Sequence, residues 1–230
     1  MKKIFTLSIL ALMPLLAMAD DQGTCGENIT WTYTESTKTL TIEGTGAMTD
    51  YTMEAPWHTH SSSIQTVEIG DGVTHIGQGT FLLCTSLTSV SIPNSVTSIG
   101  EGAFSACQVL TSITIPASVT AIDDDVFMGC VALTAINVMA TTPPKLGNTV
   151  FYVISDDAKI YVPAGTEDDY KTKWSIYADM IVGDDTCTGI DNLYGNQRKN
   201  ANKAGAIKYA KNGQLLIKSA NGNYTVAGAR

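Results

Sequence analysis

The chain has 230 residues, with 14 lysines and arginines against 22 aspartates and glutamates, so its formal net charge is −8 at pH 7. The charge is uneven, because residues 20–189 hold 5 basic and 21 acidic residues whereas residues 190–230 hold 7 basic residues and 1 acidic residue. An acidic body argues against a nucleic-acid partner, since phosphates require a basic surface. The contrast also indicates two modules, an acidic body and a basic tail.

Residues 1–19 have the pattern of a secretory signal peptide. Lys2 and Lys3 precede an apolar run from Ile4 to Leu16, and a small-x-small cleavage site ends at Ala19. The run is too short for a membrane-spanning helix, and no later stretch predicts a membrane span. We therefore expect cleavage after Ala19 and a mature protein that is secreted or held at the outer cell surface.

Residues 20–63 are predicted to form an N-terminal cap. Two short runs at 29–33 and 39–42 flank the turn sequence ESTK and predict a β-hairpin. Such a hairpin would cover the first edge of the structure that follows, where an exposed strand invites aggregation. Cys25 is expected to lie before the first strand.

An internal repeat follows the cap. Three units of 23 residues align without gaps, beginning at Val73, Val96 and Val119. Apolar residues and one cysteine persist at equivalent positions, namely Ile76/Ile99/Ile122, Phe81/Phe104/Phe127, Cys84/Cys107/Cys130 and Leu87/Leu110/Leu133. A repeat of this length predicts a solenoid, because one unit cannot bury its apolar face alone and stacked copies place like residues on like. Weaker matches extend the predicted solenoid over residues 64–165.

The repeat predicts one parallel ladder of six short strands, near residues 39–43, 66–69, 89–92, 112–115, 135–138 and 159–162. Side chains alternate along a strand, so Val90 and Ile92 are expected to point inward while Ser89 and Ser91 point outward. On the opposite side of each coil, the phenylalanine is expected to lie in a single helical turn. A glycine such as Gly77 is expected to permit the tight bend before that turn.

The outward strand positions form the candidate binding face. They carry small hydroxyls and amides with little charge, and solenoids commonly bind through such extended surfaces. The candidate binding residues are Glu68, Ser89, Ser91, Ser112, Thr114, Asn137 and Tyr161. The alternative is that serine and threonine are simply suited to exposed strand positions.

The repeat pattern V-T-x-I-G-x-x-A-F-x-x-C-x-x-L-T-S-I-x-I-P resembles the BspA-like leucine-rich repeats of surface proteins from Bacteroidetes-type and related bacteria. Residues 23–51 resemble the N-terminal cap of that family, and residues 162–174 resemble the way its arrays end. The resemblance implies a leucine-rich-repeat solenoid, with short parallel β-strands on one face and turns and single helical turns on the other. Since the family includes adhesins, it also implies a binding role.

Three segments complete the chain. Residues 166–182 are predicted to form a C-terminal helical cap, with Thr166 as N-cap and Tyr170, Trp174 and Tyr177 on the face that covers the last coil. Residues 183–204 are predicted to be a linker, and residues 205–230 a small three-stranded β tail with two Asn-Gly turns. The tail resembles C-terminal sorting segments of the type IX secretion route. A sorting signal and an ordinary small β-module both remain open.

The cysteines are predicted to stay unbridged. Stacked cysteines in the repeat would point in parallel directions, so a column of buried thiols is expected at Cys84, Cys107 and Cys130. Cys25 and Cys187 lie at opposite ends of the predicted stack, so they are expected to be free or intermolecular thiols.

No cofactor, metal or catalytic residue is predicted. His58 and His60 form an H-x-H pair near His75, but no third or fourth ligand is evident. The run 123–125 of three aspartates lacks the spacing of a calcium loop and is interpreted as a solvated bend. The chain has no G-x-S-x-G elbow or phosphate-binding loop, so it is not expected to be an enzyme.

The predicted function is non-enzymatic adhesion to an extracellular protein or glycan, on host matrix or on other cells. The secretion machinery is the second expected partner, through the signal peptide and the tail. Two alternatives are kept, namely a passive envelope or scaffold protein and a substrate-binding accessory of a secreted hydrolase.

Overall fold

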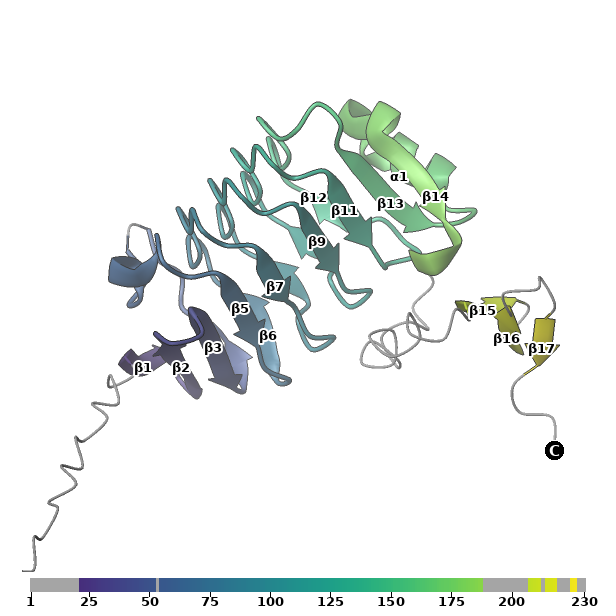
Figure 1. Ribbon diagram of the computed structural model, residues 1–230. Helices are drawn as coiled ribbons and strands as arrows, with labels where there is room; N and C mark the ends of the chain where they lie inside the picture. The colour runs from purple at the N-terminus through teal and green to yellow at the C-terminus, as the bar shows by residue number, and fades with distance from the viewer. Residues whose placement is uncertain (1–20, 53, 188–206, 212–213, 219–223, 227–230) are drawn as a thin grey trace, which may run out of the picture.

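The computed structural model describes residues 21–52 and 54–187, and the backbone of three further strands within 207–226. The predicted signal peptide, residues 188–204 of the predicted linker and the two Asn-Gly turns of the tail lie outside the described residues. Residues 21–187 form a solenoid of stacked coils (Figure 1). Among the helices described, none is long and apolar enough to cross a membrane.

The front of the solenoid carries parallel strands at the predicted positions (Figure 1). They are β3 (Thr39–Gly44), β5 (Thr66–Ile69), β7 (Ser89–Ser91), β9 (Ser112–Ile115), β11 (Ala135–Val138) and β13 (Lys159–Pro163). The predicted alternation is confirmed, since Ser89 and Ser91 are exposed and Val90 and Ile92 pack against the core, although the latter two are only half-buried. The equivalent Ile113 and Ile136 are fully buried. The single ladder expected from the repeat is wrong, however. Strands β3, β5 and β7 belong to one sheet and β9, β11 and β13 to another, without pairing between β7 and β9.

A second parallel sheet forms the back of the solenoid and was not predicted. Its strands are β4 (Gly46–Ala47), β6 (Val73–Ile76), β8 (Ser98–Ile99), β10 (Ala121–Ile122) and β12 (Lys145–Leu146), in unbroken order. Most of these strands have two residues, so they show no alternation of their own in the sequence. Their ladder is fixed by the stacking of fully buried residues such as Ile76 and Ile99.

The third side of each coil holds the predicted column of stacked rings. Neighbouring centroids in the series Trp57, Phe81, Phe104, Phe127 and Phe151 lie 5.8, 5.1, 5.5 and 5.7 Å apart, with interplanar angles of 4–23°. Such offset stacking adds to the apolar burial of each ring. The stack confirms that residues 23 apart lie in one column.

The backbone around these rings forms hydrogen-bonded turns, not the predicted single helical turns. Its amides alternate between two kinds of acceptor. Phe81 N and Leu83 N donate to Ala103 O and Ser105 O of the next coil, at 2.8 and 2.9 Å, whereas Leu82 N donates back to Gly79 O. In a helix every backbone amide would donate to a carbonyl of the same helix, so the hydrogen bonds to the next coil would be lost.

The role predicted for Gly77 is also different in the structure. Its φ is not in the left-handed region, so the bend does not require glycine for its conformational freedom. A Cβ at Gly77 would instead lie 2.2 Å from Thr49 O of the preceding coil, and a Cβ at Gly100 would lie 2.7 Å from Gln78 N. Glycine is needed here because the backbones of successive coils approach closely.

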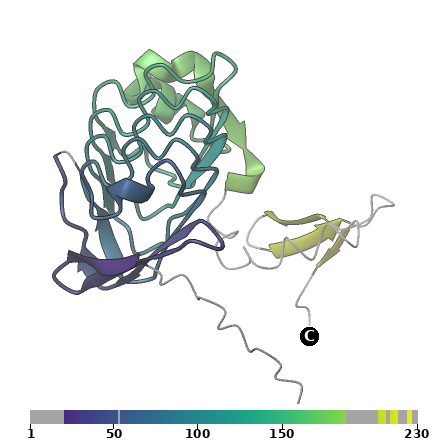
Figure 2. The ribbon, with the colours of Figure 1, turned by 60° about the vertical axis from the view of Figure 1, so that its left-hand side comes forward.

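The N-terminal cap is an antiparallel sheet of β1 (Asp21–Gly26), β2 (Ile29–Thr34) and β3, which continues into the front of the solenoid (Figure 2). The predicted hairpin is confirmed, but Cys25 lies inside β1 and not before the first strand. The 3₁₀ turn η1 (His58–His60) follows Trp57. Trp57 Nε1 donates to Thr80 O at 2.9 Å and joins the cap to the ring column.

The C-terminal end is covered by α1 (Glu167–Lys173), the 3₁₀ turns η2 (Ser175–Met180) and η3 (Asp185–Cys187), and β14 (Ile181–Asp184) (Figure 2). Tyr170 Oη donates to Ala140 O at 2.7 Å, and Trp174 Nε1 donates to Pro144 O at 3.0 Å, so the predicted aromatic face does lie on the last coils. Thr166 occupies the N-cap position, but its hydroxyl donates to Pro163 O and makes no cap bond.

Strand β14 changes the boundary predicted for this cap. It pairs parallel with β13 from Ile181 to Asp184, across the point where a linker was expected to begin at residue 183. The ordered fold continues into η3, where Cys187 is buried. A short polar sequence with glycine predicts a linker, but pairing with an existing edge strand overrides that local preference.

The tail contains β15 (Ile207–Lys211), β16 (Gln214–Lys218) and β17 (Tyr224–Val226). They pair antiparallel in that order, which confirms the predicted three-stranded arrangement.

Candidate binding face

The front strands place the candidate residues in two straight columns. In the first column, Thr41 pairs with Glu68 and Glu68 with Ser91, and beyond the unpaired step Thr114 pairs with Asn137 and Asn137 with Tyr161. In the second column, Ser89 pairs with Thr66, and Ser112 pairs with Ala135, which pairs with Lys159. All seven predicted binding residues therefore lie on one face.

The side chains of this face differ in how far solvent reaches them. Glu68, Ser91 and Thr114 are exposed, whereas Asn137 and Tyr161 are half-buried. Asn137 Nδ2 donates to Ile113 O at 3.4 Å, so one of its two donors already serves the fold. The hydroxyls and carboxylate of the other three residues are the more accessible groups.

A groove lies at the carboxyl ends of β3, β5 and β7. It is open, encloses about 560 Å³, and is lined by Thr41, Glu43, Glu68, Ile69, Gly70, Asp71, Ser91, Ile92, Pro93 and Asn94. Of this lining, only Glu68 and Ser91 were predicted as binding residues. Thr41, Glu43 and Ile69 belong to β3 and β5, and the remaining residues come from the turns after β5 and β7. The signal that could have found these turn residues is the shared chain direction, because parallel strands end at one edge.

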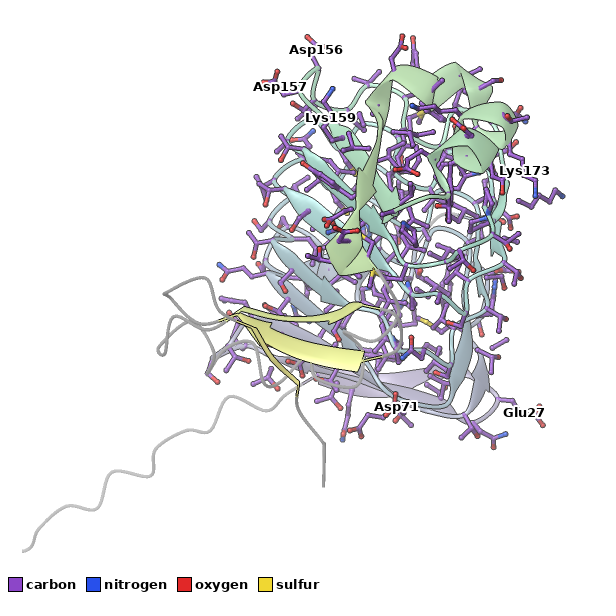
Figure 3. The ribbon with its side chains drawn as sticks, turned by 90° about the vertical axis from the view of Figure 1, so that its right-hand side faces the viewer. Glu27, Asp71, Asp156, Asp157, Lys159 and Lys173 are labelled. Carbon is purple, nitrogen blue, oxygen red and sulfur yellow. The ribbon has the colours of Figure 1, made fainter. Side chains whose placement is uncertain are left out.

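The charge of this face changes along the solenoid. Between Lys38 and Lys145 the chain has no lysine or arginine, so the carboxylates of Glu43, Glu68 and Asp71 give the groove a negative potential. Asp71 lies at the N-terminal end of the solenoid, and Lys159 lies at the opposite end near Asp156 and Asp157 (Figure 3). The groove thus offers carboxylate and hydroxyl acceptors beside apolar surface.

The repeat cysteines are buried thiols, as predicted. Cys107 Sγ donates to Phe81 O at 3.4 Å and Cys130 Sγ donates to Phe104 O at 3.2 Å, and none of the described cysteines forms a disulfide. Cys25 and Cys187 are buried too, which argues against the intermolecular bridges considered for them. Burial raises the pKa of the Cys84 and Cys25 thiols to about 12.

We expect the folded protein to resist thiol reagents. At pH 8 a thiol with a pKa of about 12 is ionised in only about one molecule in 10⁴, and the thiolate is the reactive form. Ellman's reagent should therefore react with all 5 cysteines in guanidinium but with neither Cys25 nor Cys84 during minutes in buffer. Stoichiometric reaction of the native protein at Cys84 would contradict this burial.

The histidines serve the N-terminal cap. The H-x-H pair lies on the 3₁₀ turn η1 and not on a strand, so the two rings do not share a strand face. His60 Nε2 lies 2.6 Å from Asp21 Oδ2, and its ring stacks on Tyr33 at 4.2 Å. His75 Nδ1 lies 2.7 Å from Ser98 Oγ. Among the described residues, no three potential metal ligands come together.

The aspartate run at 123–125 joins two coils. Asp124 accepts hydrogen bonds from Asn148 N at 2.8 Å and Asn148 Nδ2 at 3.2 Å, and these bonds lower the pKa of its carboxyl group. Asp125 adopts a left-handed φ of 58° and contacts the hydroxyl of Thr149. The solvated bend predicted here is thus also a structural contact with the following coil.

Residues 57–168 match six copies of the family described as "BspA type Leucine rich repeat region". A leucine-rich repeat protein from Eubacterium ventriosum is similar in structure, with a TM-score of 0.52 and 26% identity over 87% of this chain and 49% of that protein. The chain therefore spans about half the length of that relative.

Two further bacterial structures align less closely. One is a leucine-rich repeat protein from Bacteroides ovatus, with a TM-score of 0.41 and 29% identity over 54% of this chain and 30% of that protein. The other is a leucine rich cell surface protein from Faecalibacterium prausnitzii, with a TM-score of 0.35 and 18% identity over 90% of this chain and 61% of that protein. None of the curated proteins matches the chain.

Proposed function

Since its repeats make this chain a member of the BspA-type leucine-rich repeat family, we propose that it is a non-enzymatic binding protein that acts outside the cell. It holds an extracellular protein or glycan on the front face of the solenoid, and so mediates adhesion to host matrix or to other cells. The single observation that supports this role most is the open groove beside Glu68 and Ser91.

The chemistry of the groove suits polyhydroxyl or amide-bearing ligands. Carboxylates accept strong hydrogen bonds from hydroxyl and amide donors, and the Ser91 hydroxyl both donates and accepts. Ile69 and Ile92 supply apolar surface in the same groove. Each contact on such an open surface is weak, so useful affinity depends on many copies of the protein on one cell.

Export supports the same role. The basic start, short apolar run and small-residue site of residues 1–19 direct a chain to the secretory route. In this proposal the β tail acts as the signal for passage through the outer membrane, and the protein is then released or attached at the surface.

The proposal is tested by screening the protein on an array of glycans and matrix proteins. A positive ligand should lose affinity about tenfold or more when Ser91, Thr114 and Asn137 are each replaced by glutamate, since an unpaired charge buried under the ligand or a steric block costs more than one lost contact. Thr97→Glu provides the control, because Thr97 is exposed and directly precedes β8 on the back of the solenoid.

The outcomes separate the alternatives. Equal loss in the front-face and Thr97 variants would place the ligand elsewhere. The absence of any ligand would favour the passive scaffold, and turnover of a polysaccharide or peptide would refute the non-enzymatic role.

A further inference from the structure

The front of the solenoid has a seam between β7 and β9. The steps on either side of it close through two amides that share a carbonyl: Thr88 N and Ser89 N donate to Gln65 O at 2.9 and 3.2 Å, and Thr134 N and Ala135 N donate to Thr111 O at the same distances. At the seam the equivalent donors are Thr111 and Ser112 and the equivalent acceptor is Thr88. No such bond forms among the described residues.

The seam also loosens the core beneath it. Val90 on β7 and Ile92 directly after it are only half-buried, whereas Val67 is fully buried and the equivalent residues of β9, Ile113 and Ile115, are 2% and 0% exposed. Thr111 and Ser112 are exposed, so solvent reaches the edge that lacks its partner.

Proline supplies a cause for the missing pairing. After β5 and after β11 the strand ends are closed by amides, since Gly70 N donates to Ile42 O at 2.8 Å and Met139 N donates to Ile115 O at 3.0 Å. The residues in these positions after β7 and at the end of β9 are Pro93 and Pro116, which have no amide hydrogen. Strand β7 therefore lacks the closing bond on both of its sides. Its pairing with β5 persists because Thr88 N and Ser89 N still donate to Gln65 O, whereas the step to β9 lacks these bonds as well.

The back and the ring column remain closed at the same step. Strands β8 and β10 pair through Ser98 with Ala121 and Ile99 with Ile122. Phe104 N donates to Val126 O at 3.0 Å. The rings of Phe104 and Phe127 are nearly parallel, at 6°. If β7 and β9 move apart at the front, the N-terminal and C-terminal halves of the solenoid therefore rotate about the intact back sheet and ring column.

We propose that this seam is a hinge that lets the front face change its curvature. It divides the candidate binding residues into two groups, with Glu68, Ser89 and Ser91 on the N-terminal half and Ser112, Thr114, Asn137 and Tyr161 on the C-terminal half. A ligand that contacts both halves selects one angle between them, and a ligand held only in the groove leaves the angle free. The effect of a ligand on the angle rests on the proposed function, but the hinge itself does not.

Amide exchange measured by NMR without ligand tests the open edge. Thr111 and Ser112 should exchange about tenfold faster than Thr134 and Ala135, their equivalents one coil later, because local opening exposes amides that lack a partner. Equal protection at the two pairs would overturn the proposal, whether or not a ligand is found.

Spin-label distances test the motion. A label pair in Glu68→Cys/Asn137→Cys spans three steps of the front, and a pair in Thr74→Cys/Lys145→Cys spans three steps of the back. The front pair should show the broader distance distribution, and equal widths would overturn the hinge.

A proline substitution tests the cause. Pro116→Ala restores a donor for Ile92 O and should slow the exchange of Thr111 and Ser112 about tenfold. Pro163→Ala is the matched control, because Pro163 is the last residue of β13, which is already paired with β11, and it should leave those amides unchanged. Exchange at Thr111 that does not respond to Pro116→Ala would overturn proline as the cause.

Discussion

Replacing Phe104 by alanine is expected to lower the free energy of unfolding by about 3–5 kcal/mol. Phe104 is 0% exposed and stacks between Phe81 and Phe127, with centroid distances of 5.1 and 5.5 Å. The substitution removes both ring contacts and leaves a cavity that the neighbouring rings cannot fill, because each is held by its own coil. Denaturation in guanidinium, followed by far-ultraviolet circular dichroism, measures the loss.

The matched control for this prediction is Tyr152→Ala. Tyr152 is an aromatic residue on the same side of the solenoid, but it is 60% exposed. Its loss should change the free energy of unfolding by about 0.5 kcal/mol or less. A cost below about 1 kcal/mol for Phe104→Ala would show that the rings do not form a continuous packed column.

The ring column was predictable because an apolar core repeats with the sequence. A phenylalanine every 23 residues indicates that the equivalent rings contact one another, because stacked coils place equivalent residues on top of each other. The same logic located the front strands, whose inward valines and isoleucines alternate with outward hydroxyls. The N-terminal cap was predictable from the two short runs around the turn sequence ESTK, and the C-terminal cap from the spacing of Tyr170, Trp174 and Tyr177.

The back sheet and the groove were not predictable in this way. Two-residue strands such as β8 carry no periodic signal, and their pairing follows only once the coils are stacked. The groove combines strand ends with turns such as Gly70–Asp71, and turn residues vary without a rule that alternation could detect. To predict the seam, one must compare Pro93 and Pro116 with the residues at the same position in the neighbouring coils. The pattern of a single repeat does not contain that comparison.

The second large effect is expected from Gly77→Ala, which should cost about 3 kcal/mol in free energy of unfolding. The added methyl group would lie 2.2 Å from Thr49 O and 2.7 Å from Thr49 C. Both are backbone atoms, so no side-chain rotation relieves the clash, and the coils must move apart. The back ladder between β4 and β6, which lies next to this contact, would lose part of its pairing.

Gly70→Ala separates this clash from the general cost of losing glycine. A Cβ at Gly70 would lie 3.0 Å from Ile42 O, a contact that a small shift relieves. Alanine also restricts the unfolded chain, which offsets a fraction of the cost at both sites. We therefore expect about 1 kcal/mol for Gly70→Ala, measured under the same denaturing conditions. Equal costs at the two positions would mean that glycine is required for its own flexibility and not for the close approach of neighbouring coils.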